Sequence, residues 1–156
     1  VNYLFHDDWA EKATDVLQQK SNVAIDMQAE FNESSSVISI ETGLTFFEPV
    51  EDRHKFNIFI VEDSIVQFQK YYGHDPVDIK DYVHNHVLRD GVYGAWGTSV
   101  NEFAVGEEEE VTINCSYVIQ SNTDWRWKKI HLIGVVMDEN NDFEILQVEQ
   151  IPLYQE

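Results

Sequence analysis

At 156 residues the chain is long enough for one ordinary domain with a hydrophobic core of its own. Apolar residues make up 43% of it and aromatic residues 13%, a composition that supplies ample core material and excludes an intrinsically disordered protein. Ten Lys and Arg oppose 29 Asp and Glu, and the net charge of −19 argues against a nucleic-acid partner and against contact with anionic lipid headgroups, because such a field repels both.

The first element that the sequence predicts is a helix over residues 8–19. Asp8 and Glu11 have the spacing of a capping box, and acidic residues suit the positive end of the helix dipole. The apolar residues of this segment recur at helical spacing on one face: Trp9, Ala13, Val16 and Leu17. We expect residues 1–20 to be a leading helix and the end of a link to an N-terminal part outside this chain, since the sequence begins abruptly with aromatic residues close to its first position.

From residue 23 onward the apolar residues recur at every second position. Residues 23–31 and 38–46 alternate in this way on either side of a polar turn, which predicts an antiparallel hairpin. Residues 56–61 are apolar on both faces, as in a central strand, and residues 65–69 form a short strand after a polar corner. Three more strands are predicted over residues 111–119, 129–137 and 143–151.

Seven or eight strands and one leading helix do not alternate along the chain, which makes a parallel sheet an unsuitable architecture. We predict a mainly β fold over residues 21–156, an antiparallel two-sheet β-sandwich that is immunoglobulin-like or a related Greek key. Cys115 is the only cysteine, and its alternate neighbours are apolar. We therefore expect it to face inward as a packing residue, with no internal disulfide.

The stretch between residues 71 and 109 has the least regular pattern. Residues 82–89 fit a strand that places His84, His86 and Leu88 on one face. They also fit a helix, because Val83 and Val87 lie four residues apart. We adopt the strand.

Three stretches, in this order and at this spacing, resemble a known family: residues 59–66 (FIVEDSIV), residues 82–89 (YVHNHVLR) followed by Trp96-Gly97, and residues 145–148 (ILQV). They are similar to the C-terminal domain of the Bacteroidetes outer-membrane lipoprotein family named for its twenty-eight-kilodalton member, over about residues 20–152. The resemblance implies an outer-membrane location, on the periplasmic or the surface side. It further implies a lipid anchor and an N-terminal part outside this chain, no catalytic residues, and an adhesin- or receptor-like role.

His84 and His86 are the candidates for a metal site. Two residues apart on a strand they would share a face, and both imidazoles could then bind one zinc ion. A metal-dependent hydrolase built on this pair is the alternative function. No spacing in the sequence nominates a third ligand, so we expect both residues to be structural and expect no cofactor.

Trp125, Arg126 and Trp127 are the candidates for a binding surface. On a strand beside the polar turn at residues 121–124, the two indoles would share a face. Paired aromatic side chains at a loop edge stack sugars or anchor protein partners, although an indole can equally fill the end of a core. Ser64 lies in an Asp-Ser-apolar sequence that resembles the acceptor pattern of envelope O-glycosylation in the same lineage.

The function that these patterns favour is a non-catalytic binding or structural domain of an outer-membrane, surface-associated lipoprotein. Its partner would be a protein or a glycan at the cell surface. Contact with the membrane would be made only through the lipid anchor outside this chain, since the sequence contains no apolar run of about 20 residues.

Overall fold

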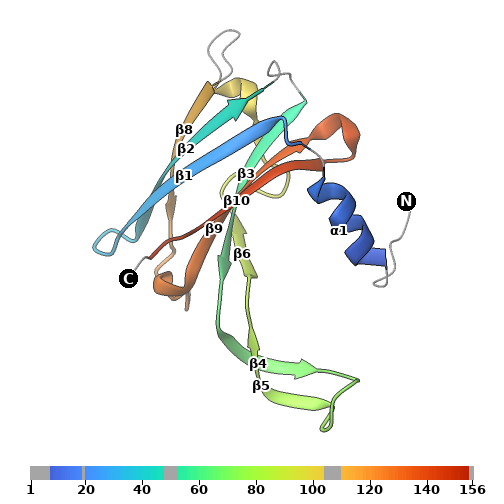
Figure 1. The fold of residues 1–156 in the computed structure, drawn as a ribbon. Helices are drawn as coiled ribbons and strands as arrows, with labels where there is room; N and C mark the ends of the chain where they lie inside the picture. Colours follow the sequence, from blue (N-terminus) through green and yellow to red (C-terminus); the bar gives the residue numbers. More distant parts are fainter. Residues whose placement is uncertain (1–7, 19, 48–52, 104–109, 155–156) are drawn as a thin grey trace.

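The structure, a computed structural model, describes residues 8–18, 20–47, 53–103 and 110–154 (Figure 1). Within these ranges the chain forms one α-helix, α1 (Trp9–Leu17), and ten strands. The strands are β1 (Val23–Asn32), β2 (Val37–Phe46), β3 (His54–Glu62), β4 (Ile65–Lys70), β5 (Asp78–His84), β6 (Val87–Gly91), β7 (Thr98–Ser99), β8 (Glu110–Val118), β9 (Ile130–Asp138) and β10 (Glu144–Pro152).

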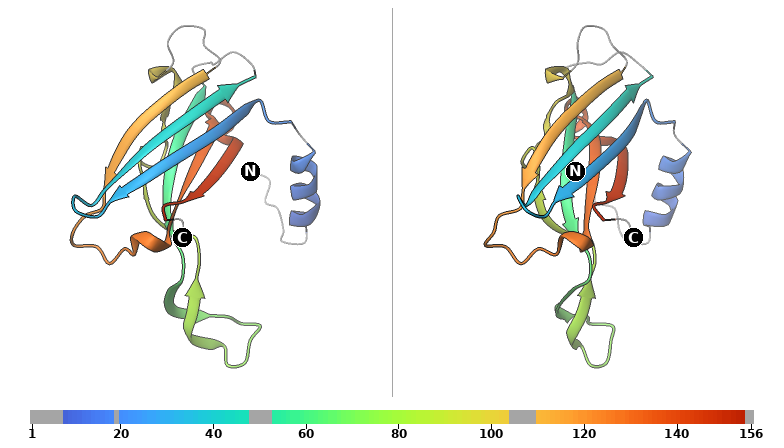
Figure 2. Two further views of the ribbon diagram at one scale, coloured as in Figure 1. Left: turned by 60° about the vertical axis from the view of Figure 1, so that its left-hand side comes forward. Right: turned by 90° about the vertical axis from the view of Figure 1, so that its left-hand side faces the viewer.

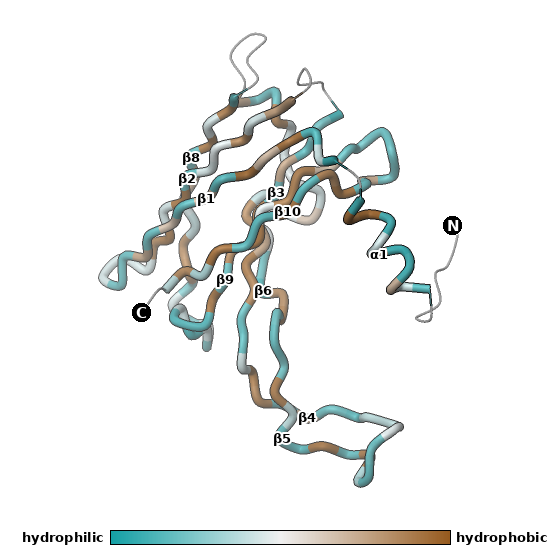
Figure 3. Tube along the Cα trace, in the orientation of Figure 1, coloured by the Kyte–Doolittle hydropathy of each residue, from teal (hydrophilic) through white to brown (hydrophobic). Residues whose placement is uncertain are grey.

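One layer of the fold is the antiparallel sheet β1-β2-β8. Its register pairs Ala29 with Ile40, and Ile40 in turn with Cys115, so the apolar residues of all three strands share one face. Hydrophilic and hydrophobic residues alternate along these strands (Figure 3). The period of two that predicted a hairpin at residues 23–46 is therefore confirmed, and the inward face supplies half of the core.

The second layer has the strand order β10-β9-β3-β6, with β7 pairing with β3. All pairs in it are antiparallel, and the central strands β3 and β9 carry half of the largest fully buried side chains, among them Phe56, Ile58, Ile60 and Leu132. Residues 56–61 were expected to be a central strand, and they are. The two layers face each other as an antiparallel β-sandwich (Figure 2), which confirms the predicted fold class.

The hairpin of β3 and β6 continues beyond the sandwich as a two-stranded ribbon, β4 and β5, which projects from one end of the molecule (Figures 1 and 2). We call this ribbon, residues 65–84, the arm, and the end of the sandwich from which it projects the arm end. The expectation of a single strand over residues 82–89 was wrong. β5 ends at His84, and β6 begins at Val87.

The arm bends away from the sandwich at two dipeptides that face each other, Asp63-Ser64 and Asn85-His86. They interrupt the backbone hydrogen bonding between the β3–β6 pair and the β4–β5 pair. Ser64 and His86 adopt left-handed backbone conformations with φ of 61° and 52°. The Ser64 amide donates to Asn85 Oδ1 at 2.9 Å, and the His86 amide donates to Asp63 Oδ1 at 2.7 Å. Each strand thus supplies a short polar side chain that replaces a ladder bond of the other.

The leading helix lies beside the sandwich, near β10, with its apolar side chains largely in solvent (Figure 1). Trp9 is 62% exposed and Leu17 is 85% exposed. The expected capping box is absent, because the Asp8 side chain makes no capping hydrogen bond and its backbone is already helical. No helix among the described residues is long and apolar enough to cross a membrane.

Candidate functional site

The candidate residues Trp125, Arg126 and Trp127 lie on the segment that joins β8 to β9 at the arm end. The expectation that the two indoles share the face of a strand was wrong, because residues 119–126 pair with no described strand and Trp127–Lys129 form a single 3-10 turn. The Thr123 amide and hydroxyl both donate to the Gln120 carbonyl, which closes a tight polar turn before the first indole. Both indoles are half-buried, whereas Arg126 is exposed.

Trp127 packs between the two sheets at this end. Its ring centroid lies 5.0 Å from that of Phe31 and 5.3 Å from that of Tyr154, the latter in an edge-to-face arrangement. Lys128 Nζ lies 5.3 Å from the Trp127 ring and 5.0 Å from the Tyr154 ring. These contacts fix the orientation of the indole, because aromatic pairs and cation–π contacts are directional.

Trp125 is held parallel to Tyr117 of β8, with ring centroids 6.1 Å apart and an interplanar angle of 3°. The guanidinium carbon of Arg89 lies 6.0 Å from the Trp125 ring. Tyr117 itself is anchored, because its hydroxyl donates to Asp90 Oδ2 at 2.6 Å. Burial, together with this hydrogen bond and the nearby Asp90 charge, raises the pKa of Tyr117 to about 12.

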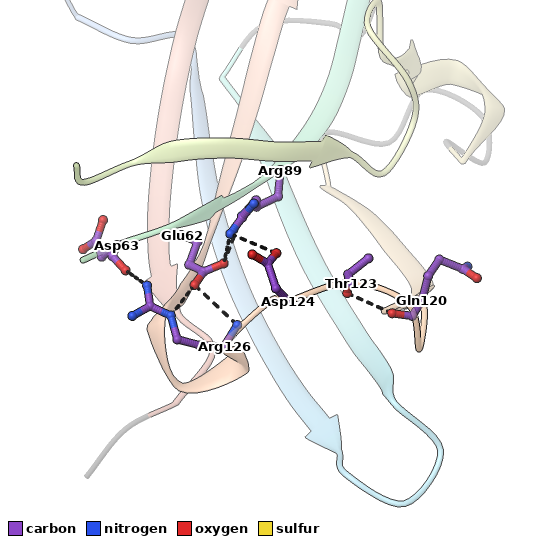
Figure 4. Close-up of polar contacts among 7 residues, drawn as sticks. All are labelled: Glu62, Asp63, Arg89, Gln120, Thr123, Asp124 and Arg126. Atoms are coloured by element: carbon purple, nitrogen blue, oxygen red, sulfur yellow. Dashed lines mark hydrogen bonds and ion pairs between the residues drawn. The ribbon is translucent and has the colours of Figure 1, made fainter. Parts of the chain in front are cut away.

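A buried carboxylate ties the Trp125–Trp127 segment to the sandwich (Figure 4). The Glu62 side chain is 0% exposed; Arg126 Nε donates to its Oε1 at 2.7 Å, and Arg89 Nε donates to its Oε2 at 2.9 Å. Asp124 Oδ1 lies 3.6 Å from Arg89 Nη2, and Arg126 Nη2 donates to the Asp63 carbonyl at 2.8 Å. A charge removed from water needs such partners on both oxygens, so Glu62 joins the end of β3, the start of β6 and the indole-bearing segment.

A surface hollow of about 310 Å³ opens between the indoles and the β1–β2 turn. Three aromatic side chains, several hydroxyl and amide groups and a single carboxylate line it: Phe31, Glu33, Ser36, Ile119, Gln120, Ser121, Thr123, Trp125 and Trp127. Apolar ring faces beside short polar side chains can stack a flat, hydroxyl-rich ligand and hydrogen-bond its rim.

The two candidate metal-binding histidines are not brought together. His84 lies on the arm, with its ring 4.8 Å from that of Tyr82. His86 lies at the bend, where its Nδ1 is 3.5 Å from Asp63 Oδ1 and its ring stacks on that of His131 at 6.0 Å. The break at residues 85–86 removes the shared face that the strand prediction required, and no group of three ligands able to hold a metal occurs among the described residues.

Two further residues singled out in the sequence have structural surroundings of their own. Cys115 packs against the core from β8 and is half-buried, and burial raises the pKa of its thiol. Ser64 is half-buried at the arm bend. The glycosylation expected there stays a prediction.

The sequence patterns did not single out Glu62. It follows a run that is apolar on both faces, and a carboxylate next to a polar corner is ordinarily exposed. The only signal was the pair Arg89 and Arg126, which become neighbours only once the β3–β6 hairpin and the β8–β9 connection have folded. Long-range contacts of this kind leave no trace in sequence spacing.

The fold and the hollow at the arm end define a mainly β domain of the sandwich class, with an aromatic surface site. The chain belongs to the family of outer membrane protein Omp28, whose family model matches residues 4–155. The resemblance found in the sequence and the outer-membrane location that it implied are thereby confirmed.

A solved structure has the same fold: a domain of the outer membrane lipoprotein Omp28 from Porphyromonas gingivalis. It aligns over 85% of this chain and 88% of its own, with a TM-score of 0.56 and 17% sequence identity. No curated protein matches the chain. At that identity the likeness shows the fold alone.

Proposed function

We propose that the chain is a non-catalytic binding domain of an outer-membrane lipoprotein and that it binds a neutral glycan in the hollow between the two indoles, Trp125 and Trp127, and the β1–β2 turn. The observation that carries this proposal is that Trp125 and Trp127, each held by ring contacts, line one hollow together with several hydroxyl and amide groups. An adhesin- or receptor-like role of the whole protein would use such a surface. The net charge of −19 disfavours acidic sugars at this site, since like charges repel.

The chemistry of the hollow supports binding rather than catalysis. Glycoside hydrolysis usually uses two carboxyl groups about 5 to 9.5 Å apart, and Glu33 is the one acidic side chain among the residues that line the hollow. Glu62 lies close by, but both of its oxygens are engaged by arginines and its side chain is buried. The alternative, a metal-dependent hydrolase based on His84 and His86, is less well supported, because His84 ends β5 whereas His86 lies at the bend after it.

The lipid anchor is part of the same proposal. A lipidated cysteine in a part of the protein outside this chain would hold the domain at the outer membrane; the solved structure with the related fold is a domain of an outer membrane lipoprotein. Replacing that cysteine should release the full-length protein from the outer-membrane fraction. A protein that stays bound to the membrane after the replacement would contradict the anchor.

Titration of the purified chain with an array of neutral hexose and N-acetylhexosamine oligosaccharides tests the glycan proposal. We expect at least one of them to bind. Trp125→Ala should weaken that binding about tenfold or more, since stacking of a ligand ring on an aromatic side chain contributes on the order of 1–3 kcal/mol. Trp96→Ala is the matched control, because that indole is 69% exposed and packs on Phe143, away from the hollow.

Thr123→Ala and Gln120→Ala provide a second test that leaves the indoles in place. Both side chains are exposed, so neither substitution removes core packing. Binding that is unchanged in all three hollow variants, or an array on which no neutral oligosaccharide binds, would contradict the proposal.

A further inference from the structure

The arm is a ribbon of two strands that the rest of the described structure leaves uncovered. Its apolar side chains are exposed on the ribbon and at its tip: Val66 at 55%, Phe68 at 54%, Val83 at 49%, Tyr71 at 54% and Tyr72 at 84%. An isolated two-stranded ribbon is marginal in water and is normally stabilised by a further strand or a covering element. The arm therefore lacks a partner.

The two edges of the arm differ in how well they resist pairing with another strand. On β5 the register skips from Tyr82 to Ile79 while β4 advances from Gln67 to Gln69, so Lys80 and Asp81 together oppose Phe68 as a bulge. Bulges and charged side chains are the devices by which proteins protect sheet edges. The β5 edge has both.

The β4 edge has no such bulge, and its one charged residue, Lys70, lies at the far end of the strand and pairs with Asp78 of β5. Residues 65–69 (IVQFQ) contain no charge, no proline and no glycine, and they are rich in residues of high β propensity. Short uncharged segments of this composition on an exposed edge are templates for pairing with another chain. Val66 and Phe68 point to the same face of the ribbon, because they are two residues apart on one strand.

Charge identifies which partner suits this edge. Residues 65–84 carry two Lys and three Asp, a net charge of −1, whereas the whole chain carries −19. Two chains that each carry a charge of −19 repel each other overall. The arm projects from the sandwich (Figure 2). Two arms can therefore meet at little electrostatic cost while the two acidic sandwiches stay apart.

We propose that the β4 edge is a self-association surface, on which two copies of the chain pair β4 to β4 and form a four-stranded antiparallel sheet. A twofold axis perpendicular to that sheet pairs side chains that lie on the same face of the sheet. One residue at the centre of the register therefore lies opposite the same residue of the partner. Centred on Gln67, it sets Val66 opposite the partner's Phe68 on both sides of the axis. Centred one residue later, it would set Val66 opposite the partner's Lys70.

Sedimentation equilibrium of the purified chain tests the association. We expect a reversible dimer, with twice the 18.2 kDa mass of one chain, at concentrations up to about 1 mM. Phe68→Glu and Val66→Lys should each weaken dimerisation about tenfold or more, since the new charge then faces an apolar side chain of the partner, Val66 or Phe68. Leu17→Glu, on the 85% exposed residue of α1, is the matched control and should leave the dimer unchanged.

Cross-linking tests the edge and the register. In a Cys115→Ser background, Gln67→Cys should form a disulfide-linked dimer on oxidation, because the two Cβ atoms meet at the axis. Lys80→Cys, on the protected edge, should not. A chain that is monomeric at every concentration would overturn the proposal. So would a dimer whose stability is unchanged by both Phe68→Glu and Val66→Lys, or one that is cross-linked by Lys80→Cys. So would a monomer whose binding to phosphatidylcholine vesicles is lost with Phe68→Glu, which would assign the arm to a lipid surface.

Discussion

Glu62 is the residue whose replacement should disturb the arm end most. Its carboxylate is buried and bonded by Arg89 and Arg126, so removing it leaves the mostly buried Arg89 guanidinium without this partner, while Arg126 stays in contact with water. Loss of one partner of a fully buried ion pair typically costs about 3 to 5 kcal/mol, and because water reaches Arg126 we expect Glu62→Ala to lower the free energy of unfolding by about 2 to 3 kcal/mol. Urea unfolding measures it.

Glu41→Ala is the control for that experiment, because Glu41 points outward from the centre of β2. Its replacement should change stability by less than about 0.5 kcal/mol. Equal stability of the Glu62 and Glu41 variants would mean that the arginine pair does not hold the segment.

Cys115 provides a pH-dependent prediction. Burial raises the pKa of its thiol, so at any given pH a smaller fraction is thiolate than in the unfolded chain. Labelling by iodoacetamide should therefore be slow in the native protein, and the rate should rise with pH through a midpoint above that of the urea-denatured chain. A native midpoint at or below the denatured one would show that the thiol is in contact with water.

At the scale of the elements, the sequence predicted those whose patterns are local. The alternation from Val23 to Phe46 and the double-faced run in β3 identified strands correctly, because a half-buried strand needs a period of two. The arm could not be found in this way. Its break depends on side chains of Asp63 and Asn85 that bond across the ribbon, and the pattern of residues 82–89 contains no signal of that bond.

The bend provides the prediction at this scale. Asn85→Ala removes the acceptor for the Ser64 amide, and a lost hydrogen bond of this kind contributes about 1 kcal/mol. We expect faster hydrogen exchange over residues 65–84, measured by mass spectrometry, with β3 and β9 unchanged. Asn114→Ala, an exposed position on β8, should leave the arm as it is. Uniform acceleration across the sandwich, or an arm that exchanges at its original rate, would contradict the role of Asn85.

For the whole molecule, the candidate binding residues were placed on the wrong element but in the correct relation to the turn that precedes them. Although the segment is irregular, each indole packs on an aromatic side chain of the sandwich: Trp125 on Tyr117 and Trp127 on Phe31. Whether a hollow forms beside the indoles depends on the β1–β2 turn, which lies about ninety residues earlier in the sequence. Only the folded sandwich brings that turn to the site.

The most direct test of a glycan-binding site at the arm end is the NMR spectrum of the four tryptophan indole N–H groups, recorded during titration with a neutral oligosaccharide that binds. The structure places two indoles at the hollow and the other two, Trp9 and Trp96, elsewhere. We predict that the signals of Trp125 and Trp127 shift as the oligosaccharide saturates the site, while those of Trp9 and Trp96 stay in place. Shifts confined to Trp9 or Trp96, or no indole shift at saturation, would contradict a binding site at the arm end.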